Sequence, residues 1–175
     1  MKKALLTILI LLLGSAAMQA QGTKAERMKY IRKVYAEAKQ KIEKDAKAAV
    51  PRNVIITLHN QEDGDSPLVT TEVKCFLERL PTFEDHCYFI STRTRSAVAD
   101  NYHEYLFAQR THDLIFSFGQ YKEGGSKNEL RFYFDESGSC IERKATIQPE
   151  EGYDDSMDER LTATRYITVI EELID

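Results

Sequence analysis

Apolar residues between Asn53 and Ile147 recur with a period of two, and this pattern constrains the fold more than any other feature of the chain. The strand-like runs begin with NVIITLH and end with SCIERKATI, and clusters of turn formers such as NQEDGDSP separate them. No helical spacing intervenes, whereas parallel neighbours would need a crossover of about a dozen residues or more. The region is therefore predicted to form an antiparallel β-meander of six to seven strands.

A helix is predicted on each side of this strand region. Thr23 and Glu26 have the spacing of a capping box, and the apolar stripe that follows predicts a long N-terminal helix over 24–48. Ser156 and Glu159 repeat that spacing before a second apolar stripe. The predicted fold class is α+β, with the N-terminal helix on one face of the sheet and the C-terminal helix on the same face or at one edge. Two shapes fit it, a cystatin-like or NTF2-like cone and a half-barrel with a cleft.

The first twenty residues have the features of an export signal. Lys2 and Lys3 precede the apolar run ALLTILILLL, and small residues follow up to Ala20. The run is shorter than the ~20 residues that span a bilayer. We therefore predict a signal peptide over 1–20 and a single α+β domain over 21–175. The protein is expected in the periplasm or outside the cell, without stable membrane insertion after cleavage.

Charge limits the class of partner. Residues 21–175 contain 22 basic and 28 acidic residues, and no local basic cluster offsets this balance. Such a chain repels phosphate backbones, so nucleic acid is not an expected partner. A small molecule, a peptide or an envelope protein is expected instead, and the sequence does not indicate an oligomeric state.

No local motif predicts catalysis, a metal site or a cofactor. The four histidines lack the short, regular spacings of zinc sites, and the acidic run over 62–66 lacks the glutamate that closes an EF-hand. The nucleophile motifs GxSxG and SxxK and the zinc-hydrolase motif HExxH are missing as well. One alternative is an envelope hydrolase whose site forms only in the fold, with Asp85, His86, Cys87 and His103 as candidates. Another is a structural or assembly subunit.

Three cysteines occur in the chain. Cys75 and Cys87 lie near the facing ends of successive predicted strands, where a hairpin would place them roughly opposite each other. They are predicted either to form a disulfide or to remain reduced as small buried residues. Cys140 is predicted to be a buried small apolar residue beside Phe134.

Aromatic residues crowd the central strands. One face of the sheet is predicted to form the core under the helices. On the opposite, open face, tyrosine and arginine side chains would form a recognition surface, because these residues are favoured anchors at interfaces. The predicted surface consists of Arg93, Arg95, Arg131 and Tyr133.

The segment RFYFDESGSCIERK resembles a hairpin found in small exported bacterial proteins of unknown function. Phe132 to Asp135, Gly138, Ile141 and Arg143 carry the resemblance, and the preceding hairpin from Tyr102 has a similar rhythm. Together these hairpins cover less than a third of the predicted domain. The resemblance implies a meander and no activity. The leading functional prediction is an exported, non-enzymatic binding domain.

Overall fold

The computed structural model describes residues 22–47, 52–61, 68–79, 85–108, 111–123, 125–146 and 155–174. The predicted signal peptide and the acidic run over 62–66 lie outside them. The described chain contains the following elements: α2 (Lys24–Asp45), β1 (Asn53–Asn60), β2 (Val69–Arg79), β3 (Asp85–Arg95), β4 (Ala99–Phe107), β5 (Leu114–Glu123), β6 (Ser126–Phe134), β7 (Cys140–Ala145) and α3 (Asp155–Ile174).

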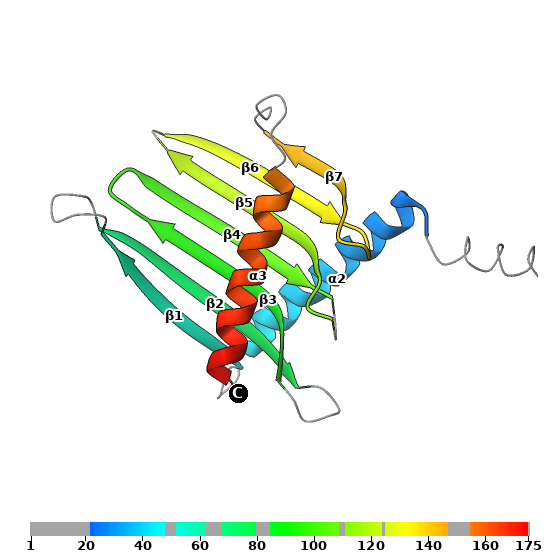
Figure 1. Ribbon diagram of the computed structural model, residues 1–175, viewed down its shortest axis with the longest axis horizontal. Helices are drawn as coiled ribbons and strands as arrows, with labels where there is room; N and C mark the ends of the chain where they lie inside the picture. The colour runs from blue at the N-terminus through cyan, green and yellow to red at the C-terminus, as the bar shows by residue number, and fades with distance from the viewer. Residues whose placement is uncertain are drawn as a thin grey trace, which may run out of the picture.

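The strands join a single sheet in chain order from β1 to β7, and every neighbouring pair is antiparallel (Figure 1). This arrangement confirms the predicted α+β class and the antiparallel meander. The turn between β6 and β7 shows how the sequence specifies it. Asp135 Oδ1 accepts hydrogen bonds from the backbone N–H groups of Ser137 and Ser139, and Gly138 takes a positive φ of 78°.

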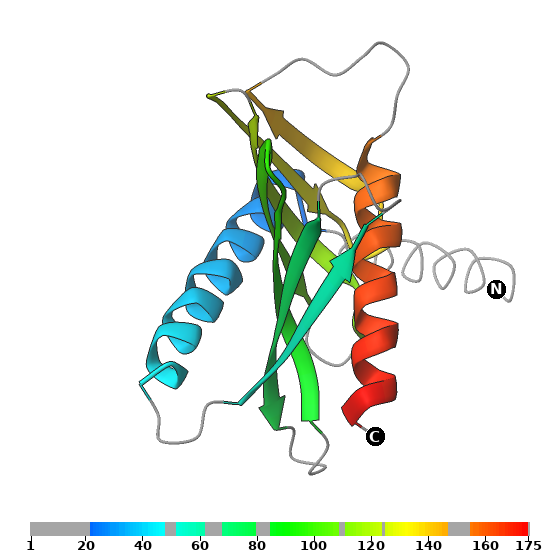
Figure 2. The ribbon, with the colours of Figure 1, turned by 90° about the vertical axis from the view of Figure 1, so that its left-hand side faces the viewer.

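The two helices lie on opposite faces of the sheet, so the fold has three layers (Figure 2). Ile31 of α2 is buried against one face, and Ile167 and Ile170 of α3 are buried against the other. The predicted packing of the C-terminal helix on the same face as the N-terminal helix or at one edge is therefore wrong. A cone or half-barrel is not confirmed, and the predicted N-terminal helix over 24–48 ends earlier, at Asp45.

Continuous buried runs in the central strands explain the two-sided cover. The runs are 86–90 in β3, 104–107 in β4, 114–117 in β5 and 132–134 in β6. A strand covered on one face alternates between apolar and polar residues, whereas a strand covered on both faces reads as one apolar run. All four runs lie at the same end of the sheet, where the helices cover both faces. The other end is more polar and partly open.

The predicted capping box at the start of α2 is confirmed. The Glu26 backbone N–H donates to Thr23 Oγ1, and the Thr23 backbone N–H donates to the Glu26 carboxylate. At the start of α3, Arg143 of β7 donates to both carboxylate oxygens of Asp155. Among the described residues, no helix is both long and apolar enough to cross a membrane.

Candidate functional site

A cavity of about 170 Å³ opens between α2 and strands β5 and β6. It lies where the doubly covered end of the sheet meets the open end. Its lining consists of Ile31, Arg32, Tyr35, Phe116, Phe118, Arg131 and Tyr133. The sheet register pairs Phe116 with Tyr133 and Phe118 with Arg131, so β5 and β6 present these four side chains on one face. We call this the α2 cavity.

The floor of the α2 cavity is aromatic. The Phe116 ring centroid lies 4.8 Å from that of Tyr35 and 5.0 Å from that of Tyr133. Tyr133 is only 6% exposed, because α2 covers this part of the sheet. Its predicted place on an open face is therefore wrong. Its ring contributes to the floor of the cavity instead.

The rim of the cavity is cationic. The Arg131 guanidinium lies 5.1 Å from the centre of the Phe118 ring, and its Nη2 donates to Glu129 Oε2 at 2.7 Å. Arg32 is exposed on α2 and forms no hydrogen bond or ion pair with another described residue. The paired Lys24 ammonium lowers the pKa of Glu142, and the charge of Arg32 contributes to this shift. An anion at this rim would therefore meet two guanidinium groups: that of Arg32, which forms no ion pair within the described residues, and that of Arg131, which is paired with Glu129.

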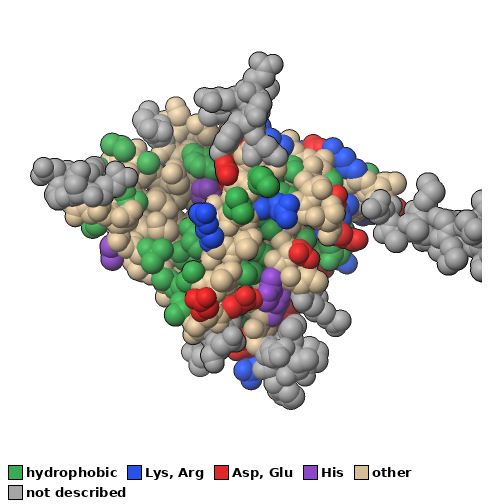
Figure 3. Space-filling model, viewed as in Figure 1, with side chains coloured by type: hydrophobic (Ala, Val, Ile, Leu, Met, Phe, Trp, Pro, Cys, Tyr) green, Lys and Arg blue, Asp and Glu red, His purple; other side chains and the backbone are tan. Residues whose placement is uncertain are grey.

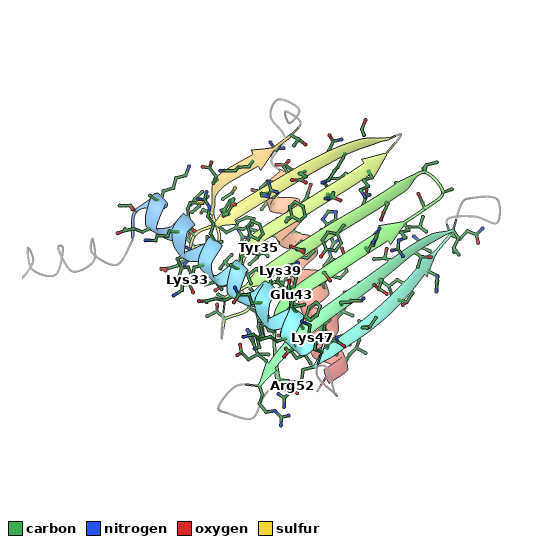
Figure 4. All side chains as sticks on the ribbon, turned by 180° about the vertical axis from the view of Figure 1, so that it is seen from behind. Lys33, Tyr35, Lys39, Glu43, Lys47 and Arg52 are labelled. Carbon is green, nitrogen blue, oxygen red and sulfur yellow. A yellow bond between two sulfur atoms is a disulfide. The ribbon has the colours of Figure 1, made fainter. Side chains whose placement is uncertain are left out.

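A buried carboxylate fixes one wall of the cavity. Glu104 of β4 is 3% exposed and accepts hydrogen bonds from the hydroxyls of Tyr35 and Tyr102, the latter at 2.6 Å. Lys39 Nζ lies 2.6 Å from the same carboxylate. Tyr35 and Lys39 lie one turn apart on α2 (Figure 4), so a single acid holds two side chains of the helix. Tyr35 is thereby oriented before any ligand arrives.

Burial and the hydrogen bond to Glu104 raise the pKa values of Tyr35 and Tyr102 well above the ordinary tyrosine value. Both phenols therefore stay protonated at any physiological pH and remain hydrogen-bond donors. Neither is suited to act as a base. These phenols hold the helix and the cavity wall in position.

Arg93 and Arg95 lie apart from the α2 cavity, towards the open end of β3. Arg93 forms a bidentate pair with Asp100, with N–O distances of 2.8 and 2.6 Å, and Arg95 Nε lies 3.9 Å from Asp100. The hydrogen bond from Arg93 lowers the pKa of Asp100. Of the four residues predicted for the recognition surface, the structure thus brings Arg131 and Tyr133 together in the cavity and places Arg93 and Arg95 elsewhere.

The hydrolase candidates do not form a common site. Cys75 and Cys87 form a disulfide with a Cα–Cα distance of 6.2 Å, so Cys87 is not a thiol nucleophile. Asp85 pairs with Arg79. The two candidate histidines lie in separate clusters, as described next.

His86 stacks on His112 with ring centroids 4.3 Å apart. His103 lies under α3, where Nδ1 is 3.3 Å from the Tyr105 hydroxyl and 3.7 Å from Glu159 Oε1. His86 is buried, and burial followed by the nearby His112 lowers its pKa. These two pairs are built into the helix–sheet contacts, and neither contains a serine or cysteine nucleophile.

The burial predicted for Cys140 is not found. Cys140 pairs with Phe134 across the β6–β7 ladder, as expected, but its side chain is exposed rather than buried. The register shifts between Tyr133 and Phe134, and β7 is an edge strand, so little covers the thiol there.

A larger hollow of about 620 Å³ lies between the start of α2 and the β6–β7 turn. Its charged side chains already contact one another or the backbone. Arg27 donates to the Phe134 carbonyl and to Glu136. Glu26 caps its own helix. The α2 cavity is the better candidate site because Arg32 on its rim forms no such contact with the residues that the structure describes.

Several residues of the site were not identified from the sequence. Tyr35 is part of the apolar stripe that predicts the N-terminal helix, and neither Arg32 nor Lys39 stands out among the charged residues of that helix. Glu104 carried the clearest available signal, because it interrupts the apolar run of β4 on the face shared by Tyr102 and Leu106. A single acid within a buried run needs donors nearby.

No three His, Cys, Asp or Glu side chains gather as a metal site in the part of the chain that the structure describes. No protein-family model, curated protein or solved structure matches the chain.

Proposed function

We propose that the chain is an exported, non-enzymatic binding domain that holds a small amphipathic anion in the α2 cavity. The anion would carry a carboxylate and an apolar group about the size of one aromatic ring. The observation that carries this proposal is the pairing of a rim containing Arg32 and Arg131 with a floor of aromatic rings.

The size of the cavity sets the size of the apolar group. An apolar cavity of about 150 Å³ accommodates benzene. The α2 cavity, at about 170 Å³, suits a single ring or a short branched acyl chain. Phe116 and Tyr133 would contact such a group from below, and Tyr35 from the helix side.

The charges of the rim set the polarity of the ligand. A guanidinium binds a carboxylate through two parallel hydrogen bonds, which are stronger than neutral ones. Arg131 is already shared with Glu129, so Arg32 is the stronger anchor in this proposal. The Tyr35 hydroxyl donates its single proton to Glu104, so Tyr35 would contact the ligand through its ring rather than bind the carboxylate.

Export is supported by the signal-like sequence over 1–20 and, weakly, by the Cys75–Cys87 disulfide, which suits an oxidising compartment. The hydrolase alternative receives no support from the positions of its four candidate residues.

Benzoate and benzamide, which share one shape and differ in charge, test this proposal. We expect benzoate to shift the amide NMR signals of α2, β5 and β6 saturably, and benzamide to bind at least about tenfold more weakly. Replacing Arg32 by methionine keeps an apolar stem and should weaken benzoate binding by about tenfold.

Arg165→Met is the matched control, because Arg165 is exposed on α3, on the other side of the sheet. It should bind benzoate as the unchanged protein does. Equal binding of benzoate and benzamide would contradict the proposal. Shifts confined to the β6–β7 turn would place the ligand in the larger hollow instead.

A further inference from the structure

The sheet has two edges of different character. β7 is six residues long and carries Glu142, Arg143 and Lys144, charges that discourage pairing with another strand. β1 is eight residues long, NVIITLHN, with no Asp, Glu, Lys, Arg, Pro or Gly. The devices that usually protect an edge strand are therefore present on β7 and missing from β1.

The backbone of β1 offers hydrogen-bonding groups on its outer side. The Arg52 carbonyl accepts from the Leu77 N–H, and residues of an antiparallel pair alternate between inward and outward groups. The register then directs the N–H and C=O groups of Val54, Ile56 and Leu58 towards β2. Those of Ile55 and Thr57 point away from the described sheet.

Apolar side chains also remain exposed on β1. Ile55 is 54% exposed on the α2 face, and Leu58 is 50% exposed on the α3 face. Figure 2 looks onto this edge, and neither helix crosses in front of β1. Figure 3 shows apolar side chains gathered on the β1 side of α3. Val54 and Ile56 lie on the α3 face beside Leu58.

We infer that two copies of the chain form a dimer by antiparallel pairing of their β1 strands. A two-fold axis normal to the sheet keeps both α3 helices on the same side. With the axis at Ile56, Val54 faces Leu58 of the second copy, and Ile56 faces its own equivalent. The central opposed pairs on the α3 face are then apolar, and Asn60 faces Arg52 of the second copy at each end. No charged side chain of β1 meets another, although each chain is acidic overall.

Symmetry favours a closed dimer over an open filament of copies. Pairing of β1 with β1 is isologous and closes as a dimer, whereas pairing of β1 with β7 would continue as a filament. The charges of β7 oppose that second arrangement. The dimer would extend the sheet across both copies and would leave the α2 cavity, which lies on β5 and β6, open in each.

Sedimentation velocity of the purified protein over a range of concentrations tests this inference. We expect a reversible monomer–dimer equilibrium. Leu58→Lys should weaken it at least about tenfold, because each dimer would bury two ammonium groups without partners. Val98→Lys is the matched control, since Val98 is a 72% exposed apolar residue in the β3–β4 turn, and it should dimerise normally.

The register is tested separately by oxidation of variants with one introduced cysteine in a Cys140→Ser background, where Cys75 and Cys87 are paired with each other. Ile56→Cys should give a disulfide-linked dimer, because the two residues face each other across the axis. Ile55→Cys should not, because it faces Thr57. A protein that stays monomeric into the millimolar range, or equal cross-linking of both variants, would overturn the inference. A monomer would point to a strand of a different protein as the occupant of β1.

Discussion

Glu104 and Glu159 are buried carboxylates on opposite faces of the sheet, and their oxygens are satisfied differently. Glu104 accepts from two phenols and one ammonium group. Glu159 is 8% exposed, and its Oε2 has no hydrogen-bond partner among the described residues. A satisfied buried acid specifies one packing arrangement, whereas an unsatisfied oxygen costs stability. The contact of α2 with the sheet, which Glu104 holds, is therefore better satisfied by hydrogen bonds than the contact of α3 at Glu159.

Tyr35→Phe should lower the free energy of unfolding by about 1–2 kcal/mol, because the variant removes one hydrogen bond to a buried charge without changing the ring. Urea unfolding measures this change. Tyr30→Phe is the matched control, since Tyr30 lies on the same helix but is 49% exposed, and its midpoint should not move. Equal midpoints for both variants would show that the Tyr35–Glu104 hydrogen bond does not hold α2 in place.

At the scale of elements, a histidine cluster ties three segments together. His86 is the second residue of β3, His112 lies in the β4–β5 connection, and Glu171 is on the last turns of α3. His112 Nδ1 is 2.5 Å from Glu171 Oε1, and the two imidazoles stack. Because burial and the neighbouring imidazole lower the pKa of His86, the folded protein favours its neutral form.

Stability should fall as the pH drops below about 6.5, the ordinary histidine pKa. In this range His86 takes up a proton in the unfolded chain but not in the folded protein. The loss of stability therefore continues down to the lowered pKa of His86 in the folded state. Urea midpoints between about pH 7.5 and about pH 5.5 measure it. His86→Asn should flatten this slope, and His59→Asn, at an exposed residue of β1, should leave it unchanged. A slope that persists in His86→Asn would assign it to other groups.

The face of the sheet that each helix covers is also a property of the elements. The sequence predicted both helices and all of the strands, because their periods differ and the turns between them are short. It did not indicate that the helices take opposite faces. The runs CYFI in β3 and YLF in β4 carried that information, since continuous apolar runs need cover on both faces. The polar ends of the same strands, STRTR in β3 and ADN in β4, made these runs short and the signal weak.

At the scale of the whole molecule, export and the disulfide are tested by one measurement. The intact mass of protein recovered from the periplasm or medium should correspond to a chain that begins at Gln21 and lacks two thiol hydrogens. Without a reductant, alkylation should modify Cys140 alone, which is exposed, and after reduction it should also modify Cys75 and Cys87. A mass that includes Met1, or three alkylated thiols without a reductant, would contradict the prediction.

The sequence by itself determined the elements and their antiparallel order, because periodicity, caps and turn residues act over a few neighbouring positions. It also singled out Arg131 and Tyr133 and suggested the Cys75–Cys87 pair. Only the tertiary structure decided which face each helix covers, and therefore which side chains line a cavity. Arg32, Glu104 and Phe118 come from three separate elements, and no local pattern encodes their approach. That approach depends on how α2 crosses the sheet.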